Sequence, residues 1–442
     1  MKRWYLRFCV IVFAAGALNA EPPRAMPPPN ILLIVIDTLR YSATSFPDPS
    51  RNNTPFLARL AARGVLFTNA YSTHDFTPTS HFSMFTGLQN GLGTDDDRPE
   101  NALPYQLGRA GYSTFALVAN DLIGQKQMPT FRGFGDFRQT GDVITGTALD
   151  ALADTTDIDA HLAMFNCRPT AHARAMVYFS AQRLLPIFLQ QIRAARPPYF
   201  GFVNLVDPHE PYIPDPSIYP PERSVPPGFN GDVLQRRLGP ELRDPDAIDD
   251  PARRAYVKQK ISEAGAKSLT AIDLSPQARA IYRARYRATV RETDIALEEF
   301  FGMLDKERLL EDTVVIITSD HGESFGEADL ITHMFNDQGD YESTHHVPML
   351  IVLPPRMRTS TRTIDRKVSI ANLAPTVYDL AGMNWSALQA RYNGYPRSLL
   401  PLFSTTAPVY TAEVLLPRPE KQDHAEAIRE REKSMKSLGY IH

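Results

Sequence analysis

Asn30-Ile-Leu-Leu-Ile-Val-Ile-Asp37 is an unbroken apolar run, rich in β-branched residues, that ends on an acid. Runs of this kind are typical of strands that are buried on both faces, as in a parallel sheet. Three further runs share this character, at residues 199–206, 313–320 and 347–353. Helical patterns occur between and around them, at residues 54–63, 105–110 and 278–304. The alternation predicts an α/β fold, with a mainly parallel sheet and helices on both of its faces.

The acids at the ends of these runs are the first candidates for a functional site. Asp37 and Asp320 each close a run, and Asp207 directly follows one. In open α/β sheets the ligand binds beyond the carboxyl ends of the strands. We therefore expect these three carboxylates to lie at one edge of the sheet.

Length and composition set limits on the class of protein. The 442 residues carry a formal net charge of −3 and are 43% hydrophobic. A chain of this length buries a large core, and its balanced charge argues against a nucleic-acid partner, which would require a basic surface. We expect a catalytic domain over residues 30–358, with insertions at about 141–196 and 211–275, and a smaller C-terminal subdomain and tail over residues 359–442.

The first 20 residues have the pattern of a secretory signal peptide. Basic residues precede an apolar run at residues 8–18, which is well short of the ~20 residues that span a bilayer. We therefore predict cleavage, a periplasmic or secreted location and no stable membrane span afterwards; an uncleaved N-terminal anchor is the alternative. The proline-rich residues 21–29 read as a spacer. Cys9 lies in the leader, so Cys167 alone remains in the mature chain and no intrachain disulfide can form.

Asp320-His321-Gly322-Glu323 begins where a strand gives way to a loop. An adjacent acid and histidine on such a turn can direct a carboxylate oxygen and an imidazole nitrogen to one metal ion. Taken alone, such a pair is more often structural, but Asp37 at the end of another strand favours a metal site. These ligands suit Zn, Mn, Mg or Ca, and the sequence leaves the choice open.

Thr77-Pro78 is the start of a predicted helix. A hydroxyl here is well placed as a nucleophile, because the first amides of a helix and its dipole favour a negative phosphoryl or sulfuryl group beside it. The alternative is that Thr77 only caps the helix, with Pro78 at its first position. Local spacing alone favours the cap.

Two histidines stand apart from these motifs. His209 follows a predicted strand, and His333 lies twelve residues after His321. Isolated histidines are most often surface residues. In a metal site they can instead contact the substrate's oxygens, protonate its leaving group or hold a second metal ion.

In chain order, these motifs resemble those of the sulfatase family within the alkaline phosphatase superfamily. The matching segments are the strand ending at Asp37, Thr77 to Gly87, Asp207-Pro-His-Glu-Pro-Tyr212, Thr318-Ser-Asp-His-Gly-Glu323 and His346-Val-Pro-Met-Leu-Ile351. The resemblance covers roughly residues 29–440 and implies the alkaline-phosphatase-like fold.

The resemblance also implies roles for individual residues and a divalent metal cofactor. Its metal ligands are Asp37, Thr77, Asp320 and His321. Its catalytic residues are Thr77, as the nucleophile, with His209 and His333. Its substrate-binding residues are His81, which stands where the family has an arginine, and Asn120.

The sequence departs from ordinary sulfatases at the residues that handle sulfate. Those enzymes convert a Cys or Ser into formylglycine, which Thr77 cannot yield, so we expect no formylglycine. The family's Gly-Lys-x-x-His motif is absent after Gly111-Tyr112, and no lysine lies between His321 and Tyr341. Thr38 replaces the second acid of the first strand.

A threonine nucleophile with these ligands is similar to phosphoethanolamine transferases and lipoteichoic acid synthases. We therefore predict an exported, metal-dependent hydrolase of phosphate mono- or diesters that works through a covalent Thr77 intermediate. The substrate would be a small-molecule or a lipid- or glycan-linked ester. The alternatives are a sulfuric ester hydrolase, a phosphoryl-group transferase and a catalytically silent periplasmic binding protein.

Overall fold

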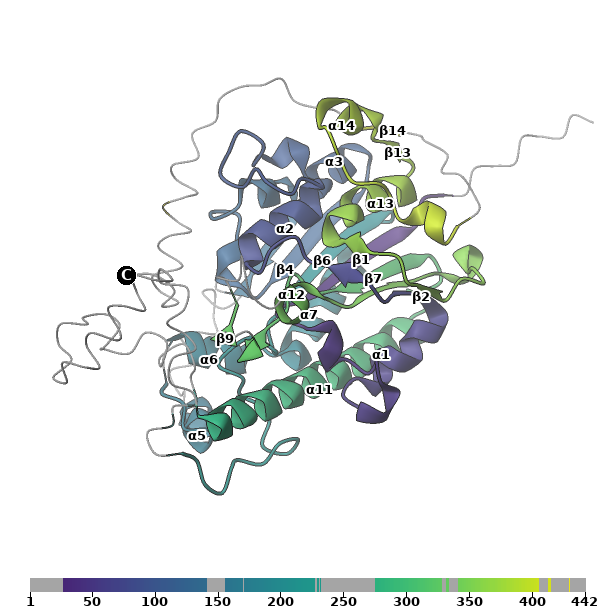
Figure 1. Ribbon diagram of the computed structural model, residues 1–442. Coiled ribbons are helices and arrows are strands. Elements are labelled where there is room, and N and C mark those ends of the chain that lie inside the picture. The colour runs from purple at the N-terminus through teal and green to yellow at the C-terminus, as the bar shows by residue number, and fades with distance from the viewer. Residues whose placement is uncertain are drawn as a thin grey trace, which may run out of the picture.

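The computed structural model describes residues 27–140, 156–169, 171–226, 275–327, 331–333, 341–404 and 412–414, with residues 229, 231 and 429. Its centre is an eight-stranded sheet in the order β11-β2-β10-β7-β1-β6-β4-β5 (Figure 1). The strands are β1 (Asn30–Ile36), β2 (Gly64–Phe67), β4 (Ser113–Val118), β5 (Asp136–Gln139), β6 (Tyr199–Leu205), β7 (Thr313–Thr318), β10 (Met349–Val352) and β11 (Thr363–Ile364). The α/β fold predicted from the sequence is confirmed.

Most neighbouring strands of this sheet run parallel. β7, β1, β6, β4 and β5 form one parallel block. β10 runs antiparallel to both of its neighbours, β7 and β2, so the run at residues 347–353 forms the antiparallel member of a mainly parallel sheet. The alternating helices predicted from the sequence supply the crossovers that parallel strands require.

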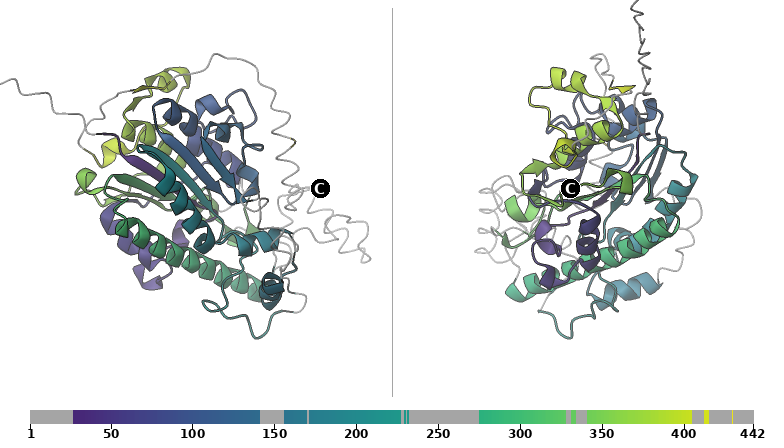
Figure 2. Two further views of the ribbon diagram at one scale, coloured as in Figure 1. Left: turned by 180° about the vertical axis from the view of Figure 1, so that it is seen from behind. Right: turned by 90° about the vertical axis from the view of Figure 1, so that its right-hand side faces the viewer.

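Helices cover both faces of the sheet (Figures 1 and 2). One face packs against α2 (Thr77–Thr86), α3 (Leu103–Arg109) and α13 (Leu373–Leu380). The other packs against α1 (Pro55–Leu60), α7 (Ala181–Ala194) and α11 (Pro276–Lys306). Strand β1 serves both cores, because its side chains alternate between the faces. Leu33 and Val35 lie in the first core, whereas Ile34 and Ile36 lie in the second, which explains the unbroken apolar run.

Shorter elements complete the described chain. The helices are α5 (Thr156–Met164), α6 (Ala171–Tyr178), α12 (Tyr341–His345) and α14 (Ser386–Arg391). The two-stranded pairs are β3 (Ala70–Tyr71) with β12 (Val368–Ser369), β8 (Ser324–Phe325) with β9 (Ile331–Thr332), and β13 (Met383–Asn384) with β14 (Ala412–Glu413). The C-terminal elements around α13 share the first core with α2, so they are packed onto the main sheet.

The register of the central strands brings distant residues to one edge. Val35 of β1 pairs with Asn204 of β6 on one side and with Thr318 of β7 on the other. The segments that follow these three strands therefore leave the sheet at the same level, which is where the sequence predicted the functional site.

Some predictions fall on residues that the structure does not describe. The leader at residues 1–20 and most of the C-terminal tail lie outside the described residues. Within the described part of the chain, no helix is both long enough and apolar enough to cross a membrane. Cys167 is buried with its thiol free of any disulfide.

Candidate active site

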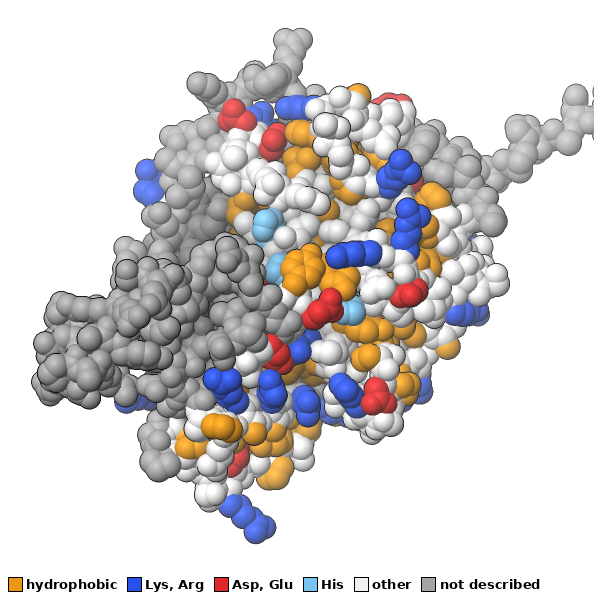
Figure 3. Space-filling model, in the orientation of Figure 1, with side chains coloured by type: hydrophobic (Ala, Val, Ile, Leu, Met, Phe, Trp, Pro, Cys, Tyr) orange, Lys and Arg blue, Asp and Glu red, His pale blue; other side chains and the backbone are white. Residues whose placement is uncertain are grey.

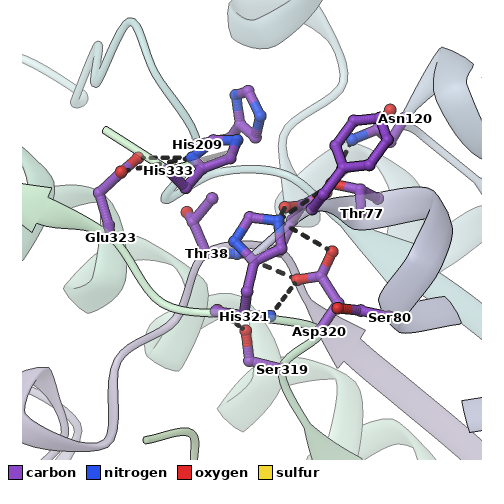
Figure 4. Close-up of polar contacts among 12 residues, drawn as sticks. Thr38, Thr77, Ser80, Asn120, His209, Ser319, Asp320, His321, Glu323 and His333 are labelled. Carbon is purple, nitrogen blue, oxygen red and sulfur yellow. Dashed lines mark hydrogen bonds and ion pairs between the residues drawn. The ribbon is translucent and has the colours of Figure 1, made fainter. Parts of the chain in front are cut away.

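The first cluster of polar side chains lies just beyond β1 and β7. Asp37, Asp320 and His321 are all fully buried there; Figure 4 shows Asp320 and His321 side by side. His321 Nε2 lies 3.4 Å from Asp320 Oδ2 and 3.8 Å from Asp37 Oδ1. The structure thus brings together, around one imidazole nitrogen, two acids that are more than 280 residues apart in sequence.

Thr77 joins this cluster from the start of α2. Its Oγ1 lies 3.1 Å from His321 Nε2 (Figure 4). The residue at the N-cap position is Phe76, and no side chain caps the helix there. The interpretation of Thr77 as a helix cap is therefore wrong, because Phe76 occupies the cap position and the Thr77 hydroxyl contacts the His321 ring. Pro78 does occupy the first turn, where the absence of an amide hydrogen does no harm.

The turn after β7 is held by its own hydrogen bonds. Asp320 Oδ1 accepts from the amide of His321 at 2.9 Å and from the amide of Thr38 at 3.3 Å. Ser319 Oγ donates to the His321 carbonyl oxygen at 2.6 Å and accepts from the Leu39 amide at 2.9 Å. One oxygen of Asp320 is thus fixed by backbone donors, and the other, Oδ2, faces His321.

Burial disfavours the ionised forms of both acids in this cluster when no cation balances them. Burial, with the neighbouring Asp320 charge, raises the pKa of Asp37 to about 6. Burial likewise raises the pKa of Asp320 to about 6. Among the described residues, Asp37 Oδ1 and Asp320 Oδ2 accept no hydrogen bond. Two such oxygens beside an imidazole nitrogen and a hydroxyl fit a divalent cation, which would balance both charges.

His81 and Asn120, the predicted substrate-binding residues, lie against the acids. Asn120 Nδ2 donates to Asp37 Oδ2 at 2.8 Å, and Asn120 Oδ1 accepts from the Leu122 amide at 2.9 Å. His81 Nδ1 lies 2.8 Å from the Thr77 carbonyl oxygen and 3.6 Å from Asp320 Oδ2. Burial lowers the pKa of His81 to about 3, so its ring is neutral.

A second cluster adjoins the first and contains the two histidines singled out from the sequence. The rings of His333 and His321 are 4.4 Å apart between centroids, and those of His209 and His333 are 5.1 Å apart. Both histidines are buried, so the interpretation of them as surface residues is wrong. Two glutamates accompany them. Glu323 Oε2 lies 3.3 Å from His333 Nδ1 (Figure 4), and Glu210 Oε2 lies 3.6 Å from the same nitrogen.

Charge shapes this second cluster as well. Burial opposes a charge on His209, but the nearby Glu210 and Asp37 carboxylates outweigh it and raise the pKa of His209. Burial raises the pKa of Glu323 well above its ordinary range, and Glu210 adds to the shift. Tyr212 Oη donates to Glu323 Oε2 at 2.7 Å.

Two glutamates of the site were not predicted from the sequence. Glu210 directly follows His209 and Glu323 lies two residues after His321, both inside motifs that were recognised, but neither received a role. Thr38 adopts a φ of +59°, which is unusual for a β-branched residue. The adjacency of a glutamate to a histidine after a strand was the available signal for Glu210. Thr38 was noted only as standing where the family has a second acid.

Asp207 does not belong to the site, contrary to expectation. Its two carboxylate oxygens accept from the Ala181 amide at 2.9 and 3.0 Å and so serve the start of α7. Burial raises the pKa of Asp207 to about 6. Asp207 lies only two residues before His209, yet its carboxylate accepts hydrogen bonds from the start of α7 instead of serving as a ligand.

One surface hollow adjoins the site, and another follows α11. Tyr71, Thr73, Tyr341 and Lys367 line the first, with Ser72, whose hydroxyl donates to the Asp320 carbonyl oxygen. The Lys367 ammonium lies 4.4 Å from the centre of the Tyr71 ring. The second hollow follows the outer side of α11, where a row of basic side chains is visible in Figure 3.

Comparison with known proteins agrees with this architecture. The sulfatase family model matches residues 29–383. The choline-sulfatase of Rhizobium meliloti is 24% identical over 437 residues, covering 87% of this chain and 74% of that protein. Arylsulfatase K of Gallus gallus is 27% identical over 410 residues, covering 90% and 70%. The solved structure of the phosphonate monoester hydrolase of Agrobacterium radiobacter superposes with a TM-score of 0.55 at 20% identity, covering 80% and 74%. The chain therefore belongs to the sulfatase family and is an ester hydrolase with the alkaline-phosphatase-like fold.

Proposed function

We propose that this protein is a metal-dependent hydrolase of phosphate mono- or diesters that works through a covalent intermediate on Thr77. The observation that carries the proposal is the position of Thr77 Oγ1, 3.1 Å from His321 Nε2 and beside two buried acids. A divalent ion held by Asp37, Asp320 and His321 would lower the pKa of a hydroxyl beside it and so favour nucleophilic attack at neutral pH.

The reaction has two displacements in this proposal. In the first, Thr77 Oγ1 loses its proton to solvent and attacks phosphorus, while the bond from phosphorus to the leaving oxygen breaks. The leaving oxygen takes a proton from His209 or His333. In the second, water attacks phosphorus, the bond to Oγ1 breaks and Thr77 regains a proton. The N-terminal amides of α2 face the negative phosphoryl group throughout.

His81 and Asn120 act in this scheme as positioning residues. Asn120 holds Asp37 through a 2.8 Å hydrogen bond, and His81 is engaged with the backbone of Thr77. Partners that orient ligating carboxylates and histidines tune a metal site without touching the substrate. The Asn120 amide is engaged on both sides, which favours this role for it; in His81 only Nδ1 is engaged, and the buried Nε2 neither accepts nor donates a hydrogen bond among the described residues.

Sulfate ester hydrolysis is the second candidate. Two relatives carry the names choline-sulfatase and arylsulfatase K, which favours it. The threonine at the nucleophile position favours phosphate, because it cannot yield formylglycine. The phosphonate monoester hydrolase shares the fold, and its name is that of an enzyme acting on a phosphorus ester.

The proposed cellular setting follows from the sequence. We infer that residues 1–20 direct export to the periplasm or beyond, where the substrate is a small-molecule or a lipid- or glycan-linked ester. The hollow lined by Tyr71, Tyr341 and Lys367 supplies ring faces and a positive charge for the remainder of such a substrate. Cell fractionation with antibodies to the full chain tests the location; a purely cytoplasmic signal would contradict it.

A panel of four p-nitrophenyl substrates tests the reaction itself. We would measure turnover of the sulfate, the phosphate, the phenylphosphonate and the bis-phosphate diester by the purified protein loaded in turn with Zn²⁺, Mn²⁺, Mg²⁺ and Ca²⁺. We expect a phosphorus ester to give the highest kcat/KM, and rapid quenching to trap a phosphorylated Thr77 peptide by mass spectrometry. Preference for the sulfate would favour the second candidate, and no turnover with any ion would contradict a hydrolase.

A further inference from the structure

The hollow that contains Lys367 adjoins the segment leading to the nucleophile and has a volume of about 370 Å³. Small-ligand sites measure roughly 300–1,000 Å³, so the hollow can take a small substituent. In its wall, the Ser72 hydroxyl contacts the Asp320 carbonyl oxygen. Thr73, also in the wall, is four residues from Thr77, and four residues span at most about 14 Å when fully extended. A substituent of an ester at Thr77 is therefore within reach of the hollow.

Two tyrosine rings of the hollow belong to a longer row of stacked rings. Tyr71 stacks against His346 at 4.9 Å between centroids and against Tyr341 at 5.5 Å. Tyr341 also stacks against His345, at 4.2 Å. Tyr71 Oη donates to Glu342 Oε1 at 2.9 Å, and His346 Nδ1 lies 3.0 Å from Glu342 Oε2. The rings are therefore held in place by one another and by this carboxylate.

Lys367 places its ammonium over these rings. Its Nζ is 4.4 Å from the centre of the Tyr71 ring and 5.4 Å from that of the Tyr341 ring. Lys367 directly precedes β12, which pairs with β3 so that Val368 lies opposite Ala70. Among the described residues, the contacts of this ammonium are with rings, and none is with a carboxylate. Because a ring attracts a cation without carrying a net charge, the positive charge is held in place but is not neutralised.

We propose that this hollow binds a second negative group on the alcohol part of the substrate, and that Lys367 selects for that group. The substrate class is then a phosphate ester of an alcohol that itself carries a carboxylate or a tetrahedral oxyanion. This deepens the proposed function and rests on it, since the hollow receives the leaving alcohol of an ester attacked by Thr77.

Other polar groups of the hollow fit an oxyanion as well. Thr73 Oγ1 is buried and makes no hydrogen bond within the described chain. Gln89 lines the same hollow and has an amide donor. Ser369 and Asn372, by contrast, are engaged with each other in a capping box. A buried hydroxyl without a partner costs free energy, which a hydrogen bond to a ligand oxygen would recover.

A quaternary ammonium is the alternative ligand for a site with several aromatic rings. Such a ligand would take a position over the ring faces. In this hollow the Lys367 ammonium already lies over Tyr71 and Tyr341 and would repel a second cation. The arrangement therefore favours a negative group over a positive one.

Phenyl phosphates with different charges on the phenol test the inference. The phenol carries a carboxylate, a sulfonate, a neutral carboxamide or a trimethylammonium group, attached through one, two or three methylenes so that its acidity changes little. We would measure kcat/KM with the full chain and the divalent ion that best supports turnover. We expect an anionic ester to exceed the carboxamide by about tenfold at the best length, near the lower end of what a hydrogen bond to a charged group contributes, and the cationic ester to be lowest. The preference should shrink as salt is raised.

Variants of Lys367 assign the preference to this residue. Lys367→Gln should lower kcat/KM for the anionic esters about tenfold more than for the carboxamide. Lys367→Glu should reverse the order of the anionic and cationic esters, and its turnover of the cationic ester shows that the fold survives. Lys367→Arg should keep the order of the wild type. Arg366→Gln is the matched control, because it removes the neighbouring positive charge from a side chain that is not among the described residues lining the hollow.

Three results would overturn the inference and leave the proposed function standing, provided that the carboxamide ester is hydrolysed. The first is equal kcat/KM for the carboxylate, sulfonate and carboxamide esters at every length. The second is a preference for the anion that survives in Lys367→Gln. The third is an equal loss of that preference in Arg366→Gln. No hydrolysis of any of these phosphate esters by the wild type would overturn both.

Discussion

The two polar clusters differ in what holds them. Asp37 and Asp320 stand at the ends of paired strands of the sheet, and Thr77 opens a helix that packs into the first core. Glu210 and His333 stand in connecting segments, the latter directly after the two-residue strand β9. The difference indicates that the first cluster is inseparable from the fold, whereas the second can change without disturbing the sheet. Nucleophilic attack should therefore depend on the first cluster, whereas the second, which protonates the leaving oxygen in the proposal, should be the more open to change.

The largest effect on activity is expected from removal of the nucleophile in the first cluster. Thr77→Ala should lower kcat by at least about 10³-fold, because it removes the proposed nucleophile, whose Oγ1 lies beside His321. Thr77→Ser should keep much of the activity. Thr79→Ala is the matched control, since the Thr79 hydroxyl donates to the Phe76 carbonyl oxygen at 2.9 Å and not to the site. Near-normal turnover by Thr77→Ala would refute the assignment.

The second cluster is probed by His333→Gln. We expect kcat to fall about 100-fold, the lower end of what a positioned proton donor contributes. Comparing the loss of kcat for substrates with different leaving groups distinguishes two roles for His333. If His333 protonates the leaving oxygen, the loss should shrink for p-nitrophenol and grow for alkyl alcohols. If it acts through a bound cation at the free oxygens, the loss should be the same for both.

A smaller effect, on metal affinity, is expected for Asn120, which supports Asp37 of the first cluster. Asn120→Ala removes the 2.8 Å hydrogen bond to Asp37, and partners of this kind typically change metal affinity by about 10–100-fold. Titration of the metal-free protein with Zn²⁺, followed by calorimetry, measures the change. Gln125→Ala, which removes a hydrogen bond from Gln125 to the Phe131 carbonyl oxygen, should leave the affinity unchanged. An unaltered affinity in Asn120→Ala would show that Asp37 needs no such support.

The smallest effect concerns pH. The pKa values of Asp37 and Asp320, each raised from 3.8 to about 6, mean that protons compete with metal below about pH 6. Affinity of the first site should drop by about tenfold per pH unit for each acid that must lose a proton. Because the folded metal-free chain binds these protons more tightly than the unfolded chain, its stability should fall as pH rises from about 4 to about 6. Denaturant midpoints across that range, with and without metal, check both signs.

The sequence predicted the first cluster better than the second for a physical reason. An apolar run that ends on an acid marks a buried strand and the edge where its last side chain emerges, so Asp37 and Asp320 could be placed from periodicity alone. Thr77 could not, because a hydroxyl before Pro78 is typical of a helix start; the resemblance, not the spacing, identified it. Which way a side chain points after a strand depends on packing that the sequence does not display. The sequence therefore could not show that Asp207 and His209, two residues apart, have different roles. Asp207 serves the start of α7, whereas His209 lies in the second cluster.

The site residues span the chain from Asp37 to His333 and meet only when β6, β1 and β7 are in register. No short segment carries a complete set of donors, so an unfolded or partly made chain has nothing with which to retain an ion. If the first cluster holds a divalent ion as proposed, that ion would be taken up where the chain folds, from the free ions of that compartment. Because affinity alone does not separate these ions, the place of folding would then decide which metal fills the proposed site.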